Sequence, residues 1–123
     1  MPRILIVAAS DSRRRLVNIL RQAGYSVAEA DSGETALKLA CANPPKLILM
    51  AIVMPEDNGL EVAAMLRKNV NCESPPIVLL GSVPPLGMND EPLASLVSGY
   101  LNFDASSHDL LATVRSQLTM NNQ

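Results

Sequence analysis

The sequence is poor in aromatic residues and in cysteine. Among its 123 residues are two tyrosines, one phenylalanine and no tryptophan, so any core must be built from aliphatic side chains. The two cysteines, Cys41 and Cys72, lack the spacing of metal ligands. We interpret them as reduced thiols of a cytoplasmic protein, and a disulfide is the alternative.

An excess of one charge and a long hydrophobic run are also missing. The net charge is −2, so nothing directs the chain toward nucleic acid or a membrane surface. No apolar segment reaches the roughly 18 residues of a membrane-spanning helix. The N-terminus is a poor secretory signal. The one basic cluster, residues 13–15, is interpreted as a solvated helix face, with a binding patch as the alternative.

Short apolar runs alternate with helical patterns along the chain. Continuous runs bounded by turn residues are typical of strands that are covered on both faces. They predict strands at residues 4–7, 25–30, 47–51, 77–80 and 99–103. Strands that alternate with helices predict a single α/β domain over residues 1–123, built on a doubly wound parallel sheet.

Helix boundaries can be assigned from capping residues. Gly24 is placed to end the first helix, Ser32 can cap the second, and Ser106 opens a capping box for the last. Residues 81–98 contain three prolines that oppose a long helix, so the fourth helix is predicted to be short or irregular. The polar tail at 119–123 is expected to fray.

Several stretches, in order, resemble one known family. The stretches "ILIV", "GYSVAEADSGETAL", "LILMAIVMPEDNGLE", "PIVLL" and "GYL" are similar to the receiver domain of two-component response regulators. The resemblance extends from about residue 3 to residue 118. It implies a flavodoxin-like (βα)5 fold with strand order 2-1-3-4-5.

The resemblance also implies a site that this sequence has lost. Receiver domains accept a phosphoryl group on an aspartate after the third strand, beside an acidic pair that holds magnesium, a Ser/Thr and a Lys. The matching positions here carry no such groups; they are Ala51 for the aspartate, Ala8 and Ala9 for the acidic pair, Gly81 for the Ser/Thr and Phe103 for the Lys. We therefore expect no catalytic residue, no bound metal and no cofactor.

Loss of these charges favours apolar packing at the old site. Three clustered carboxylates repel one another when no metal is bound, and a buried charge is costly. We predict that Phe103 tips toward Ala8 and Ala51, with a ring that points elsewhere as the alternative. Tyr100 aligns with the aromatic residue that changes rotamer in active members, and we predict that it keeps one rotamer here.

Ionisable residues near the old site have simpler explanations. We expect Asp11 to cap the first helix, and Asp104 to begin the turn into the last. Glu56 and Asp57 follow a proline and are interpreted as solvated turn residues. His108, the single histidine, is expected to be exposed on the first turn of the last helix.

A receiver scaffold without its chemistry predicts a non-enzymatic interaction module. In the family, the face made by the fourth helix, fifth strand and fifth helix binds partners or forms dimers. We predict a protein-binding surface there, or a second copy of the chain, and an output domain in a longer protein is compatible with it. Its candidate residues are Val83, Leu86, Met88, Leu93, Leu96 and Tyr100.

Two other functions stay open. The emptied crevice at the strand ends could admit a small ligand, for which Ser10, Ser82 and Asn102 would supply the polar groups. Alternatively, a substitute acid could accept the phosphoryl group.

Overall fold

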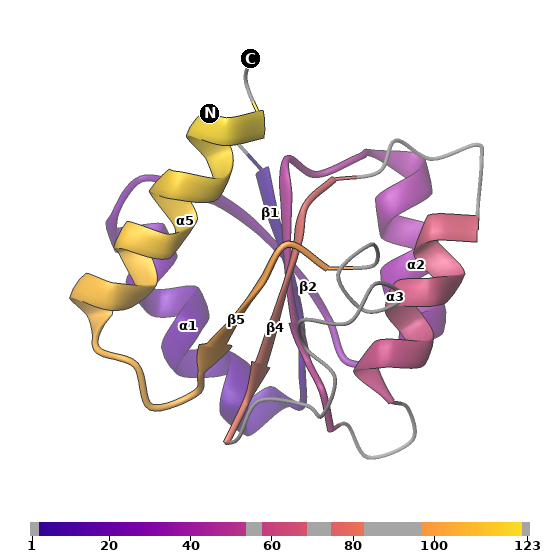
Figure 1. Ribbon diagram of the computed structural model, residues 1–123, viewed down its shortest axis with the longest axis horizontal. Helices are drawn as coiled ribbons and strands as arrows, with labels where there is room; N and C mark the ends of the chain where they lie inside the picture. The colour runs from indigo at the N-terminus through magenta and orange to yellow at the C-terminus, as the bar shows by residue number, and fades with distance from the viewer. Residues whose placement is uncertain (1–2, 54–57, 69–74, 83–96, 122–123) are drawn as a thin grey trace.

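The computed structural model of the chain describes residues 3–53, 58–68, 75–82 and 97–121. Strands and helices alternate along these residues (Figure 1). The strands are β1 (Arg3–Val7), β2 (Ser26–Ala30), β3 (Leu47–Ala51), β4 (Ile77–Gly81) and β5 (Gly99–Asn102). The helices are α1 (Ser10–Gln22), α2 (Gly33–Ala42), α3 (Gly59–Lys68) and α5 (Ser107–Asn121).

All five strands form one parallel sheet in the order β2-β1-β3-β4-β5. β1 is paired on both sides, with Ile4 opposite Val27 of β2 and Leu47 of β3. The predicted doubly wound sheet and its 2-1-3-4-5 order are confirmed. Helices cover both faces: α1 and α5 lie on one side, and α2 and α3 on the other (Figure 1).

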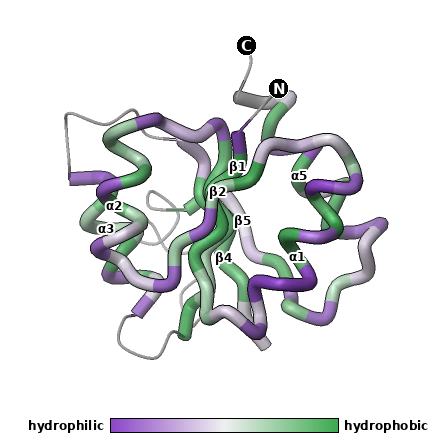
Figure 2. The backbone as a smooth tube through the Cα atoms, turned by 180° about the vertical axis from the view of Figure 1, so that it is seen from behind, coloured by the Kyte–Doolittle hydropathy of each residue, from purple (hydrophilic) through white to green (hydrophobic). Residues whose placement is uncertain are grey.

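Alternate residues of the central strands build two separate cores. Ile4 and Ile6 of β1 pack with α1 and α5, whereas Leu5 and Val7 pack with α2 and α3. β3 and β4 divide in the same way, because successive side chains of a strand point to opposite faces. Both cores are aliphatic, as the composition predicts. Figure 2 shows the hydrophobic central strands and the more polar outer helices.

Three of the predicted helix signals are confirmed, and one is wrong. Gly24 has a φ of 96°, which lets the chain turn after α1. The Ser32 hydroxyl accepts a hydrogen bond from the Thr35 amide, and Ser106 accepts one from the Asp109 amide. Asp11 does not cap α1: the N-cap is Ala9, which makes no side-chain bond. Asp11 lies two residues after this cap, in the first turn of α1, where its negative charge interacts favourably with the helix dipole.

Other expectations are corrected or lie beyond the described residues. Helix α5 continues to Asn121, past the expected start of the polar tail. Cys41 is disulfide-bonded, so the expectation of a reduced thiol is wrong for this residue. The predicted irregular fourth helix falls on residues 83–96, outside the described part of the chain. Within that part, no helix is long and apolar enough to cross a membrane.

Candidate functional site

The positions singled out by the resemblance converge at the carboxyl edge of the sheet. Ala8 follows β1, Ala51 and Gly81 are the last residues of β3 and β4, and Phe103 follows β5. The carboxyl ends of parallel strands meet at one edge, which is where α/β sheets place their ligands. Backbone bonds extend the sheet at this edge: the Phe103 amide donates to the Gly81 carbonyl at 3.1 Å.

This edge carries no side-chain ligand for a cation at the three alanine positions. Ala8 and Ala51 are 0% and 1% exposed, and Ala9 is partly buried. Magnesium prefers carboxylate and water oxygens in an octahedral shell, and alanine offers none from its side chain. Among the described residues, no group of three or more His, Cys, Asp or Glu could hold a metal ion. The residues present therefore do not fit the magnesium ion that the family implies.

Gly59 determines how closely α3 approaches the end of β3. Its amide donates to the Ile52 carbonyl at 2.7 Å. A Cβ atom here would collide with the carbonyl oxygen of Ala51, and would lie 2.9 Å from its carbonyl carbon. Only glycine allows this approach, because a side chain here would meet the backbone at the end of β3.

Tyr100 lies beside Gly81 with its hydroxyl turned inward. A Cβ atom at Gly81 would lie 3.5 Å from both Cε1 and the hydroxyl of Tyr100, and 3.1 Å from Cδ1 of Ile52. The Tyr100 hydroxyl is buried and has no hydrogen-bond partner among the described residues. A buried hydroxyl without a partner costs free energy, so within the described part of the chain packing holds Tyr100 inward. Its single rotamer and its role in binding stay predictions.

Phe103 lies at the junction of the two cores. Its ring is partly buried and packs against both of them, one of which contains Ala8 and Ala51. This placement agrees with an apolar repacking of the edge. A direct contact of the ring with either alanine stays a prediction.

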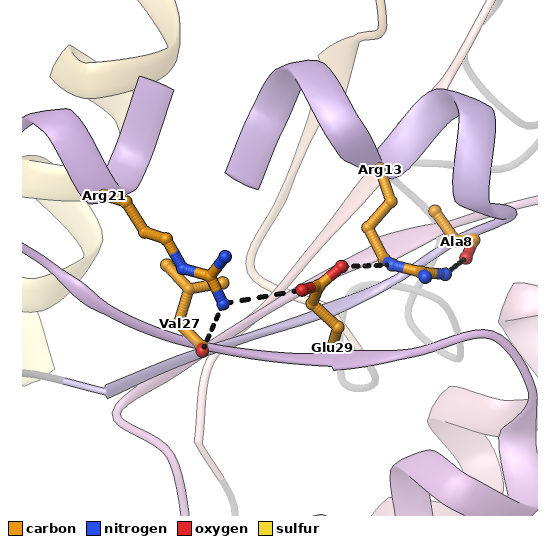
Figure 3. A network of polar contacts seen from close by, with 5 residues as sticks. All are labelled: Ala8, Arg13, Arg21, Val27 and Glu29. Carbon is orange, nitrogen blue, oxygen red and sulfur yellow. Dashed lines mark hydrogen bonds and ion pairs between the residues drawn. The ribbon is translucent and has the colours of Figure 1, made fainter. Parts of the chain in front are cut away.

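The three arginines at 13–15 lie in three different environments. The prediction of a solvated helix face describes only some of them. Arg15 crosses to the β5–α5 connection and donates to the carbonyls of Phe103 and Ala105 at 3.3 and 2.6 Å. Arg13 points the other way (Figure 3): its Nη1 donates to the Ala8 carbonyl at 2.7 Å. Arg14 is exposed. Both Arg13 and Arg15 thus bind loop carbonyls at the edge where the acidic pair is missing.

Glu29 of β2 joins Arg13 to Arg21 (Figure 3). Its carboxylate accepts from Arg13 Nε at 2.8 Å and from Arg21 Nη2 at 3.4 Å. The hydrogen bond from Arg13 is the main cause that lowers the pKa of Glu29, with the positive charges of both arginines adding to it. Sequence reasoning missed this network, because Arg13 and Glu29 are 16 residues apart and meet only where α1 packs beside β2.

The remaining candidates have local roles or lie outside the described residues. The Asp104 amide bonds the Asn102 side chain at 2.7 Å, which fits the expected turn, and His108 is exposed as predicted. The Asn102 side chain also donates to the Ser82 carbonyl, so both its polar ends are used in the loop. Outside the described residues lie Glu56, Asp57, Val83, Leu86, Met88, Leu93 and Leu96.

Comparison with known proteins identifies the family to which the chain belongs. The model of the response regulator receiver domain matches residues 4–115. The transcriptional regulator RpaA of Synechocystis is 30% identical over 119 residues, which are 96% of this chain and 49% of RpaA. The sensor histidine kinase TmoS of Ectopseudomonas mendocina is 29% identical over 119 residues, 97% of this chain. The chain spans only 12% of the length of TmoS.

Solved structures give the same result. The chemotaxis protein CheY4 of Vibrio cholerae is 28% identical with a TM-score of 0.84, over 94% of this chain and 98% of its own. The N-terminal domain of a response regulator from Carboxydothermus hydrogenoformans has the same identity and TM-score, over 98% of this chain and 96% of its own. The order of the strands, the match over residues 4–115 and these neighbours agree, and the chain belongs to the response regulator receiver domain family.

Proposed function

We propose that this receiver domain acts without phosphorylation, as a non-enzymatic protein-interaction module. The observation that carries the proposal is the composition of the carboxyl edge. Alanines stand where the resemblance places the acceptor aspartate and the acidic pair, and two of them are almost fully buried. Phosphoryl transfer in this family relies on a nucleophile, a cation and positioned charges. An edge without carboxylates at these positions offers neither the nucleophile nor ligands for the cation.

Ties between the loops at this edge also support the proposal. Arg13 donates to the carbonyl of Ala8, in the connection after β1. Arg15 donates to two carbonyls of the β5–α5 connection. Charge-assisted hydrogen bonds are about twice as strong as neutral ones. They favour one arrangement of both loops whatever the phosphorylation state of a partner kinase. A domain fixed in one conformation would bind its partner at all times, and phosphorylation would not switch that binding on or off.

The partner surface is a prediction from the family. We propose the face of the fourth helix, β5 and α5, where Tyr100 is partly exposed. Of the described residues, the large exposed hydrophobic ones are Val53 and Met65, and both lie on the β3–α3 side. They add no support to the proposed face, whose apolar residues between 83 and 96 lie outside the described part. The partner is a protein or a second copy of this chain.

The surroundings of the domain are proposals as well. RpaA is a DNA-binding regulator and TmoS a sensor kinase, and both are longer than this chain. We propose that an output domain is joined to this receiver in the same way. We also propose a cytoplasmic location, although the disulfide at Cys41 removes one of its grounds, since disulfides are rare in the cytosol.

The proposal is tested by measuring the intact mass after incubation with acetyl phosphate and magnesium. We expect no phosphoryl adduct on the native chain, because no carboxylate stands at position 51. A receiver domain with the complete acidic set serves as the positive control. The Ala51→Asp variant shows whether the acceptor alone can be restored without the acidic pair.

A labile phosphoryl adduct on the native chain would overturn the proposal. It would mean that a substitute acid accepts the group, and fragmentation of the adduct would locate that acid. Absence of an adduct would direct the search to proteins that bind the domain regardless of the kinase.

A further inference from the structure

A surface pocket between α1 and β2 is lined by three arginines. Its volume is about 230 Å³, and its lining includes none of the five degenerate positions described above. The lining residues are Ser10, Arg13, Arg14, Val17, Asn18, Arg21 and Glu29. From this pocket we propose a binding site for a small phosphate ester, independent of phosphorylation and of the proposed interaction surface.

The first argument is charge. Three guanidinium groups face one carboxylate, Glu29, so the pocket carries a surplus of two positive charges. The whole chain has a net charge of −2, so positive charge is concentrated at this pocket in a chain that is negative overall. Clefts lined by charges of one sign attract ligands of the opposite sign. A phosphate monoester carries close to two negative charges at neutral pH and would balance the surplus.

The second argument is preorganisation. Glu29 accepts hydrogen bonds from Arg13 at 2.8 Å and from Arg21 at 3.4 Å, so both guanidinium groups lie beside it before any ligand arrives, and the shorter bond holds Arg13 in place (Figure 3). The side chain of Arg13 is only 16% exposed and has a second anchor at the Ala8 carbonyl. A ligand that meets oriented donors avoids part of the entropy cost of binding.

The third argument is that donors remain unused. A guanidinium has five N–H donors in a planar fork. Arg13 uses Nε and Nη1 in the recorded bonds, and its Nη2 is left over. Arg21 uses Nη2, which leaves Nε and Nη1. Within the described part of the chain, Arg14 makes no hydrogen bond or ion pair, so all five of its donors are unused, and it lines the pocket.

The remaining lining defines the class of ligand. Ser10, Arg14 and Asn18 follow one another at intervals of four residues, so they share one side of α1. Val17 is 4% exposed and gives the pocket an apolar floor. Pockets for drug-sized ligands begin at about 300 Å³. A smaller pocket with polar sides and an apolar floor suits a phosphate group joined to a short carbon chain.

The test is a titration of the ¹⁵N-labelled chain with glycerol phosphate, followed by NMR at about 20 mM salt, where screening is weak. We expect saturable shifts of the amides of α1 and of residue 29, with a Kd of about 1 mM. The Arg14→Gln variant removes one charge from a side chain that holds no other element. We expect it to weaken binding about tenfold.

The Arg115→Gln variant is the matched control. Arg115 is exposed on α5, and among the described residues it bonds only its own helix, at the Leu111 carbonyl. It removes the same charge from the chain away from the pocket, so we expect the Kd to stay within about twofold of the native value. Equal weakening by both variants would mean nonspecific attraction and would overturn the site.

Two further results would also overturn it. One is the absence of saturable shifts at about 10 mM glycerol phosphate, ten times the expected Kd. The other is a preference for a phosphorylated protein as the source of the phosphate group. A short phosphoserine peptide carries the same group and tests this. We expect the peptide to bind no better than glycerol phosphate. A peptide preference above about tenfold would assign the pocket to a phosphorylated protein instead.

Discussion

Single residues without side chains shape the carboxyl edge. Gly59 lets α3 begin against the carbonyl of Ala51, and Gly81 lies against the side chains of Ile52 and Tyr100. In both places the neighbouring atoms are already within van der Waals distance of where a Cβ would lie. The two glycines differ in what would have to move, because Gly59 faces backbone and Gly81 faces side chains. Backbone yields less readily than a side chain.

We predict that Gly59→Ala destabilises the fold strongly. The added methyl group would collide with the Ala51 carbonyl, and relief requires a shift of α3 or β3. Overpacking of this kind costs about 1–3 kcal/mol, and we expect a loss in the free energy of unfolding at the upper end. Urea denaturation at pH 7 measures it.

Gly99→Ala is the matched control for Gly59→Ala. Gly99 has a negative φ, and the nearest atom to its added Cβ, Nε2 of Gln117, is 3.9 Å away. We expect the control to change the free energy of unfolding by less than about 0.5 kcal/mol in either direction. Similar losses in both variants would contradict the close approach of α3 to β3.

At the scale of elements, α1 is tied to its neighbours by arginines. Arg13 and Arg21 connect it to β2 through Glu29, and Arg15 connects it to the loop before α5. The existence of α1 and its C-terminal end could be predicted from its apolar spacing and from Gly24, because these are local signals. The ties could not, because they depend on which residues face one another across strands that are distant in sequence. The N-cap of α1 was predicted wrongly, since the cap is Ala9, two residues before Asp11.

The Glu29 network predicts a pH-dependent contribution to stability. Its pKa in the folded chain is lowered, chiefly by the hydrogen bond from Arg13. A lowered pKa means that the contribution is complete above the unfolded value of about 4.3, and is lost as the pH falls through the folded pKa. We expect Glu29→Gln to cost at most about 1 kcal/mol at pH 7, because the carboxylate is partly exposed.

Urea denaturation of the native chain and of Glu29→Gln at pH 7 and near pH 3 tests this contribution. We expect the difference in the free energy of unfolding to shrink at the lower pH. The control is Glu34→Gln, which removes an exposed i,i+4 pair with Lys38 worth about 0.3 kcal/mol. A difference for Glu29→Gln that stays the same at both pH values would contradict the ionic origin of the contribution.

At the scale of the whole molecule, the fold could be predicted from the sequence more completely than the binding surfaces could. Continuous apolar runs can be buried only between two helical layers, which makes a parallel sheet predictable. The strand order came from the resemblance, and the structure has the same order. The arginine pocket combines residues of α1 and β2 that only the packed fold brings together. The apolar residues of the predicted partner surface between 83 and 96 lie outside the described residues, so that surface stays a prediction.

The same edge makes a prediction for the whole domain in the presence of magnesium. A ligand that binds only the folded state raises the melting temperature, and an ion without ligands does not. We expect the Tm of the native chain to be the same with and without about 10 mM magnesium chloride at matched ionic strength. Differential scanning calorimetry measures it. Chloride is the anion of choice, because phosphate or sulfate could bind the arginine pocket.

Restoring the acids should restore the response to magnesium. A variant with Ala8→Asp, Ala9→Asp and Ala51→Asp places three carboxylates at the carboxyl edge, where they repel one another without a cation. We expect its Tm to be lower than the native value, and to rise on adding magnesium. With a Kd of about 1 mM, 10 mM magnesium would stabilise it by about 1.4 kcal/mol. An equal rise in the native chain would mean that other groups bind the ion, and that the edge has kept a function that its alanines do not reveal.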